Sequence, residues 1–190
     1  MKSLFELDHY LIRRKILKLF GASFHTFDGD RVVAFTKQKA FKLKEDIRIF
    51  DDESQSREIL SIQARHVIDF AASYDIVDPS SRETVGAARR KGFASILRDN
   101  WEVLAPGDRV IGRLEEDSAG MALLRRFLSN WIPQTFHLSV PGERAPIVFQ
   151  QHFNPFVYRL EVKIPSGCGL DRRLIFGVAA LVAAIEGRQD

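Results

Sequence analysis

Cysteine is almost absent from this chain of 190 residues, which has only Cys168. No disulfide can therefore form within the chain, and a reducing cytoplasm is the expected compartment. Residues 1–14 contain no apolar run of the kind found in signal peptides, and position 2 is not glycine, so we expect neither export nor N-myristoylation. The longest apolar run, Leu174 to Ile185, has 12 residues, whereas a membrane-spanning helix needs roughly 20. We therefore expect no transmembrane segment.

Motifs for catalysis and metal binding are also missing. The sequence has no Gly-x-Ser-x-Gly elbow, no phosphate-binding glycine-rich loop and no His-Glu-x-x-His motif. The acidic runs 51–53 and 115–117 lack the spacing of a calcium loop. The histidines are scattered without metal-ligand spacing, at His9, His25, His66, His137 and His152. We therefore expect a non-enzymatic protein without metal or cofactor; an enzyme that uses Cys168 as a nucleophile is an alternative for which no base can be named.

The composition is that of a globular protein with a sizeable core, since 45% of the residues are hydrophobic and 28% are charged. No Pro/Gly/Ser-rich linker divides the chain, so we expect a single domain over residues 1–190. The formal net charge of +3 is concentrated in the first half, which holds 17 basic and 14 acidic residues, against 11 of each in the second. A net charge of +3 is too small to indicate nucleic-acid binding.

Alternating apolar residues, separated by turn signals, predict twelve short strands. Asp28-Gly29 and Pro106-Gly107-Asp108 are strong hairpin signals because glycine tolerates positive φ. A short surface helix is predicted over 118–128. The expected strands cover 10–14, 22–27, 32–38, 46–50, 58–65, 68–76, 84–90, 100–104, 109–115, 134–140, 147–151 and 156–164.

A helix is predicted over about 171–186, with Asp171 as its N-cap and Gly187 as its C-terminal glycine. From Leu174 to Ile185 this helix has no polar face, so it must be surrounded by protein. A helix with its side chains is about 10–12 Å wide, which fits inside a barrel of eleven or twelve strands. We therefore predict a mainly β protein: an antiparallel closed barrel of about twelve strands around a central hydrophobic C-terminal α-helix.

Several segments resemble a bacterial branch of the LURP-one-related family, which belongs with the tubby C-terminal domains and the phospholipid scramblases. The segments agree in order and are Tyr10–His25, Lys39–Asp46, Gly86–Gly92, Arg98–Trp101 and Asn154–Phe156. The resemblance extends from about Tyr10 to Gly187 and implies the same twelve-stranded barrel around a C-terminal helix. For function it implies less: tubby domains bind phosphoinositide head groups, and scramblases are linked to lipid movement.

Site residues of the family do not carry over to this chain. The acidic calcium-binding segment that precedes the last helix of scramblases has no counterpart in 162–170, and their cysteine-rich palmitoylation cluster is absent. Tubby head-group residues cannot be matched one by one.

Clusters of basic residues are the candidate binding groups for an anion. They are Lys37, Lys39, Lys42 and Lys44; Arg89, Arg90 and Lys91; and Arg13, Arg14, Lys15 and Lys18. Each cluster alone is typical of a solvated face, whereas several on one face would indicate an anion site. Arg172 and Arg173 lie in the first helical turn, where the dipole disfavours cations, so each needs a partner: a carboxylate on the barrel rim, or a bound phosphate.

The leading functional hypothesis is a cytoplasmic binding module that recognises anionic phospholipid head groups, peripherally, at a membrane surface. The alternatives are a scaffold for a protein partner, and a scramblase-like lipid-handling protein without the calcium motif. Nucleic-acid binding is not expected, because most Phe and Trp residues fall in apolar patterns rather than among the basic residues.

Overall fold

The computed structural model describes residues 3–15, 22–38, 46–65, 72–90, 100–117, 133–154 and 156–186. A short 3₁₀ helix, η1 (Leu4–Glu6), comes first, and twelve strands and the helix α2 (Arg172–Glu186) follow. The strands are β1 (His9–Lys15), β2 (Ala22–Asp28), β3 (Arg31–Gln38), β4 (Asp46–Phe50), β5 (Glu58–Ala64), β6 (Ser73–Asp78), β7 (Glu83–Arg90), β8 (Asn100–Leu104), β9 (Val110–Glu116), β10 (Thr135–Ser139), β11 (Ile147–His152) and β12 (Val157–Lys163).

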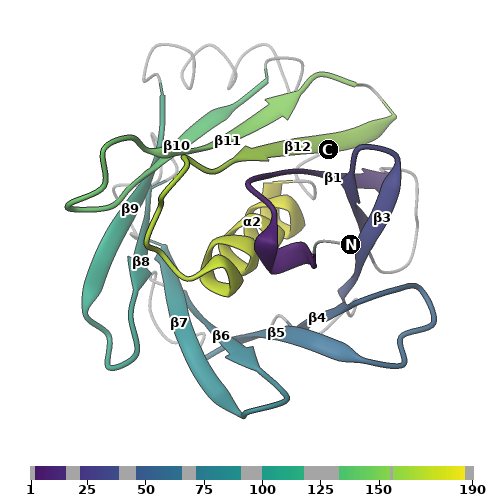
Figure 1. Ribbon diagram of the computed structural model, residues 1–190, viewed down its shortest axis with the longest axis horizontal. Coiled ribbons are helices and arrows are strands. Elements are labelled where there is room, and N and C mark those ends of the chain that lie inside the picture. Colours follow the sequence, from purple (N-terminus) through teal and green to yellow (C-terminus); the bar gives the residue numbers. More distant parts are fainter. Residues whose placement is uncertain are drawn as a thin grey trace.

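The twelve strands form one closed antiparallel barrel, as the sequence predicted (Figure 1). Each strand pairs with its neighbours in the sequence, and β1 pairs with β12 to close the ring. Most strand bounds agree with the prediction to within two residues. The sixth strand begins at Ser73 within the described part, and the predicted helix 118–128 and Gly187 lie outside the described residues.

The predicted hairpin glycines adopt the backbone conformation that their turns require. Gly29 has φ of +60° between β2 and β3, and Gly107 has φ of +79° between β8 and β9. Asp108 follows Gly107 with φ of +63°, a region that aspartate tolerates better than most side chains. These tight turns lie at one end of the barrel, which we call the hairpin end.

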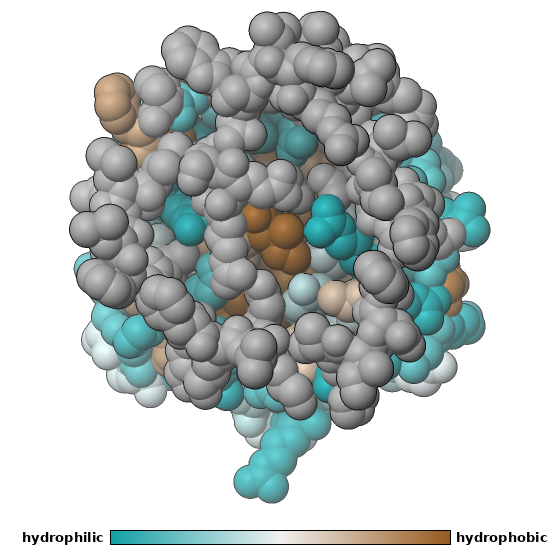
Figure 2. Space-filling model, turned by 180° about the vertical axis from the view of Figure 1, so that it is seen from behind, coloured by the Kyte–Doolittle hydropathy of each residue, from teal (hydrophilic) through white to brown (hydrophobic). Residues whose placement is uncertain are grey.

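The two ends of the barrel are distinct. At the hairpin end, the odd-numbered strands β3, β5, β7, β9 and β11 begin and α2 enters the barrel. The other end, where the odd-numbered strands finish and β12 starts, is the far end. Figure 1 looks toward the hairpin end, and Figure 2 shows the molecule from behind.

The helix α2 runs inside the barrel, enclosed by the strands (Figure 1). Residues 174–176 and 178–184 are at most 2% exposed, which confirms that a helix without a polar face is surrounded. Its packing is close: a Cβ built on Gly177 would lie 2.7 Å from Cγ2 of Ile76 in β6. The barrel wall also contains a glycine at this interface: a Cβ built on Gly86 of β7 would lie 2.9 Å from Cδ1 of Leu174 in the helix. Helix and barrel wall therefore each have a glycine where they approach most closely, Gly177 in α2 and Gly86 in β7.

No helix in the described ranges combines the length and the apolar character that crossing a membrane requires.

Candidate functional site

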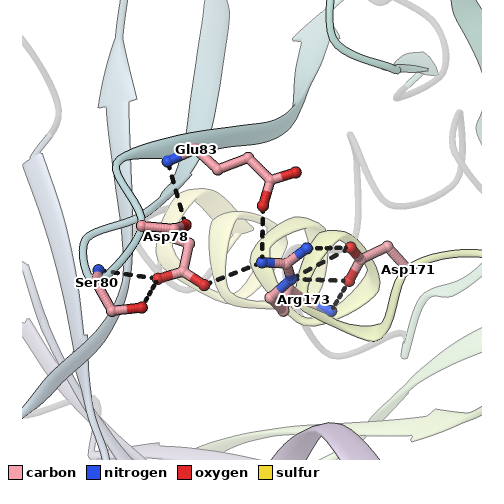
Figure 3. A network of polar contacts seen from close by, with 6 residues as sticks. Asp78, Ser80, Glu83, Asp171 and Arg173 are labelled. Atoms are coloured by element: carbon pink, nitrogen blue, oxygen red, sulfur yellow. Dashed lines mark hydrogen bonds and ion pairs between the residues drawn. The ribbon is translucent and has the colours of Figure 1, made fainter.

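The N-terminus of α2 is fastened to the barrel rim by Arg173. Asp171 caps the helix as the sequence predicted, because its Oδ1 accepts a hydrogen bond of 2.8 Å from the backbone N–H of Arg173. The guanidinium of Arg173 also donates to Asp171 at 2.7 Å and to Asp78 at 2.9 Å. Glu83 accepts at 3.2 Å, so three carboxylates surround one cation (Figure 3). Because Ser80 and Arg173 donate to it, the carboxyl of Asp78 has a pKa below its usual value.

Arg172 is held in the same way, by a hydrogen bond of 2.6 Å to Asp8, just before β1. The sequence predicted either a carboxylate of the barrel rim or a bound phosphate beside Arg172 and Arg173. In the structure, carboxylates fill this role for both arginines. The charges that oppose the helix dipole are thus neutralised within the protein.

The other predicted cations that the structure describes lie apart from one another. Lys37 of β3 is exposed and bonds Gln55 at 3.1 Å. Arg89 of β7 lies four strands away and forms two hydrogen bonds with Glu102, a residue only 8% exposed. Lys39, Lys42, Lys44 and Lys91 lie outside the described residues.

Strand alternation also separates neighbouring arginines. Arg90 is paired with the buried Trp101, and its guanidinium lies 5.8 Å from the indole centroid, so it faces inward while Arg89 faces outward. Arg14 likewise faces inward, 5.4 Å from the ring centroid of buried Phe24. Seen from behind, strongly hydrophilic residues lie beside apolar ones at the centre of the molecule (Figure 2).

On the outer wall, the closure of the barrel aligns four basic residues. Arg13 of β1 lies directly opposite Arg159 of β12, with His25 of β2 beyond Arg13 and His152 of β11 beyond Arg159. Residues directly opposed in antiparallel strands have Cα atoms about 4.5–5.5 Å apart. We call Arg13 and Arg159 the arginine pair. Like charges placed this way repel each other.

Within the described part of the chain, neither member of the arginine pair forms an ion pair or a side-chain hydrogen bond. Both side chains are half-buried, and the Nε atom of each is buried without a hydrogen-bond partner. The guanidinium of Arg13 stacks 4.4 Å from the ring centroid of Phe27. Stacking engages the face of a guanidinium and leaves its N–H edge for an acceptor.

Glu161 is the acidic residue nearest to Arg159 on the outer face of β12, but it is engaged elsewhere. His9 lies 2.7 Å from one of its oxygens, and His152 and Lys163 lie 2.9 Å and 3.0 Å from the other. Partial burial opposes the charge on Glu161, but these three partners outweigh it and hold the pKa of Glu161 at about 2. Among the outward-facing described positions of β11, β12 and β1, Glu161 is the one acidic residue.

The turn between β11 and β12 exposes two aromatic side chains at the far end. Phe153 is 48% exposed and Phe156 is 67% exposed. Asn154 fixes the turn, because its Oδ1 accepts hydrogen bonds of 3.0 Å and 2.9 Å from the N–H groups of Phe156 and Val157. Arg159 follows on β12, so aromatic and cationic side chains share this region of the surface.

The remaining candidates show no convergent chemistry. No group of metal-binding side chains occurs within the ranges that the structure describes, where His9, His25, His137 and His152 each lie next to a carboxylate. His66 lies outside those ranges. Cys168 is a free, partly buried thiol that packs against the core.

No family model, curated protein or solved structure matches the chain.

Arg159 is a residue of this surface that the sequence did not single out. No other lysine or arginine lies within three residues of it in the sequence; Lys163, at the end of the same strand, is four residues away. Only its position opposite Arg13 makes it conspicuous, and that position depends on the pairing of the first strand with the last.

Proposed function

We propose that the protein is a non-enzymatic binding module that recognises anionic phospholipid head groups at a membrane surface, through the far end of its barrel and the wall beside it. The observation that carries this proposal is the uneven distribution of charge between the hairpin end and the rest of the sequence. The hairpin-end segments 3–8, 28–31, 51–58, 78–83, 105–109, 141–146 and 164–173 contain 13 acidic and 7 basic residues, a net charge of −6. The whole chain has +3, so the rest of the sequence carries +9.

Such a polarity orients a protein at an anionic surface. A lysine or arginine close to an anionic bilayer contributes about 1 kcal/mol, and this attraction decays over a Debye length of roughly 10 Å at 0.1 M salt. The hairpin end is repelled by the same surface. The module therefore meets the membrane with its far end first, and binding is weak and reversible at physiological salt.

The exposed phenylalanines of the β11–β12 turn support the same orientation. Burying one phenylalanine in an apolar environment is worth roughly 1.5–3 kcal/mol, so Phe153 and Phe156 would add an apolar contribution that salt does not screen. The resemblance to LURP-one-related and tubby-like proteins also favours a lipid-facing role.

Vesicle sedimentation tests the proposal. The protein should sediment with phosphatidylcholine vesicles that contain phosphatidylserine or a phosphoinositide at low salt, should dissociate as salt rises, and should not sediment with phosphatidylcholine alone. Lys37→Glu and Phe156→Ser should each weaken binding, whereas charge reversal at the exposed Arg144 of the hairpin end should not.

Equal binding to neutral and anionic vesicles, or no binding at either salt concentration, would contradict the proposal. In that case the scaffold for a protein partner would be the remaining hypothesis. Arg89→Glu and Arg90→Glu are unsuitable variants, because Arg89 holds Glu102 and Arg90 packs on Trp101, so both changes should lower stability.

A further inference from the structure

We infer that the arginine pair on the barrel wall, Arg13 and Arg159, is a binding site for a phosphate group. The inference deepens the proposed function because it assigns the head-group contact to two named residues. Its membrane part rests on that proposed function. The ligand chemistry is that of a phosphate monoester or diester, which a lipid head group or a soluble phosphate can supply.

The first step is electrostatic. Guanidinium groups carry a positive charge, and direct opposition across an antiparallel pair places the Cα atoms of Arg13 and Arg159 about 4.5–5.5 Å apart. Ordinarily a carboxylate would separate them, but the described part of the structure places none against either side chain. An arrangement that is unfavourable by itself becomes favourable when an anion lies between the two cations.

The second step concerns the surrounding residues. Glu161 is the obvious competitor, and His9, His152 and Lys163 already occupy its two oxygens. These three residues therefore leave Arg159 without its nearest acid.

The third step is hydrogen-bond geometry. Guanidinium groups bind phosphate through paired N–H donors along one edge, and such charge-assisted bonds are among the strongest in proteins. The Phe27 ring covers the face of the Arg13 guanidinium at 4.4 Å and limits its rotation, so less conformational freedom is lost when an anion binds. His25 and His152 flank the pair on the same face, and the Nε2 atom of each already lies against a carboxylate, that of Glu53 and that of Glu161.

The fourth step relates the site to the membrane. The β11–β12 turn, with Phe153 and Phe156 exposed, leads directly into β12, which carries Arg159. An aromatic turn at the far end and a phosphate site on the adjoining wall are what an interfacial contact with a phospholipid requires: the rings enter the apolar boundary while the arginines meet the head group.

The test uses the full chain, the variants Arg13→Gln, Arg159→Gln and the double variant, and the matched control Arg144→Gln at the hairpin end. Binding of inorganic phosphate is measured by calorimetry at ionic strength matched with potassium chloride. Binding to phosphatidylcholine vesicles containing phosphatidic acid is measured by sedimentation in parallel. A charge-assisted hydrogen bond is worth about tenfold or more in affinity, so each single variant should lose at least that factor, and the double variant little more than either single one.

Unfolding provides a second readout that does not depend on measurable affinity. Phosphate should raise the melting temperature of the wild type and of Arg144→Gln more than it raises that of the Arg13 and Arg159 variants. Without phosphate, Arg159→Gln should be at least as stable as the wild type, because the variant removes one of two like charges that are opposed across the strand pair. This also shows that the variant folds.

The outcomes separate this inference from the proposed function. If the wild type binds phosphate and vesicles, and the arginine variants lose both, both stand, and vesicle binding without free phosphate binding identifies the head group as the source. If the wild type binds phosphate through the pair but ignores vesicles, the site stands and the membrane function fails. If the variants bind vesicles and phosphate like the wild type, or if the wild type binds neither probe, the inference is overturned.

Discussion

The close approach of Gly177 to Ile76 offers a sharp test of the central helix. The effect of Gly177→Ala on the free energy of unfolding should change sign when Ile76 is shortened. In an unhindered helix, replacing glycine by alanine stabilises a protein by about 1 kcal/mol, since alanine has the better helix propensity. Here the new methyl group would lie 2.7 Å from Cγ2, 2.8 Å from Cδ1 and 3.0 Å from Cγ1 of Ile76. Overpacking of this kind typically costs about 1–3 kcal/mol. The net effect of Gly177→Ala should therefore range from neutral to about 2 kcal/mol of destabilisation.

The same substitution should become stabilising when Ile76 is shortened. Ile76→Ala removes all three atoms that the methyl group would meet, and by itself it should cost about 2–5 kcal/mol through the cavity it leaves. In that background Gly177→Ala gains helix propensity and fills part of the cavity, so it should stabilise by about 1 kcal/mol or more. Urea unfolding of the four proteins measures this cycle. Stabilisation by the same amount in both backgrounds would show that α2 does not pack on β6 as described.

Three further expectations follow from the same structure. Ala180→Asp places an unpaired charge on a residue 1% exposed within the barrel, so it should cost about 3 kcal/mol or more in chemical denaturation, and a soluble variant of wild-type stability would refute the burial of the helix. The pKa of Glu161 is about 2 in the folded protein against 4.5 ordinarily, so its contribution to stability is present above pH 4.5 and is lost as the pH falls toward 2. Acid-unfolding curves should show this loss, and Glu161→Gln should flatten it. Cys168→Ser should leave stability and vesicle binding unchanged, because within the described ranges the thiol makes no hydrogen bond or ion pair; rapid labelling of Cys168 by thiol reagents at neutral pH would argue otherwise.

Much of the fold was predictable because its determinants are local. Alternation of apolar residues defines each strand, and Asp28-Gly29 and Gly107 mark turns whose positive φ values the structure contains. The apolar character of residues 174–185 on every side requires that they be enclosed, and a barrel is the architecture that twelve short strands can supply. Asp171 could be recognised as a cap because capping depends on residues one turn apart.

The candidate site depended on contacts that no local pattern encodes. Arg89 and Arg90 are neighbours in the sequence, yet alternation sends one outward to Glu102 and the other inward to Trp101, so a run of basic residues is not a patch. The partners of Arg173 at the helix N-terminus include Asp78, which is 95 residues away. A cluster of basic residues in the sequence therefore shows where the charges lie along the chain, but not toward which face of the barrel wall each side chain points.

The sequence by itself determined the strands, the buried helix and the excess of basic residues outside the hairpin-end segments, since these follow from side-chain type and short-range periodicity. The tertiary structure alone decided that Arg13 faces Arg159. That pairing requires the first strand to close against the last in one register, and a shift of one residue would turn either arginine to the opposite face of the wall. Register between distant strands is set by the packing of the whole barrel around α2, which is why the arginine pair emerges only when the ring is closed.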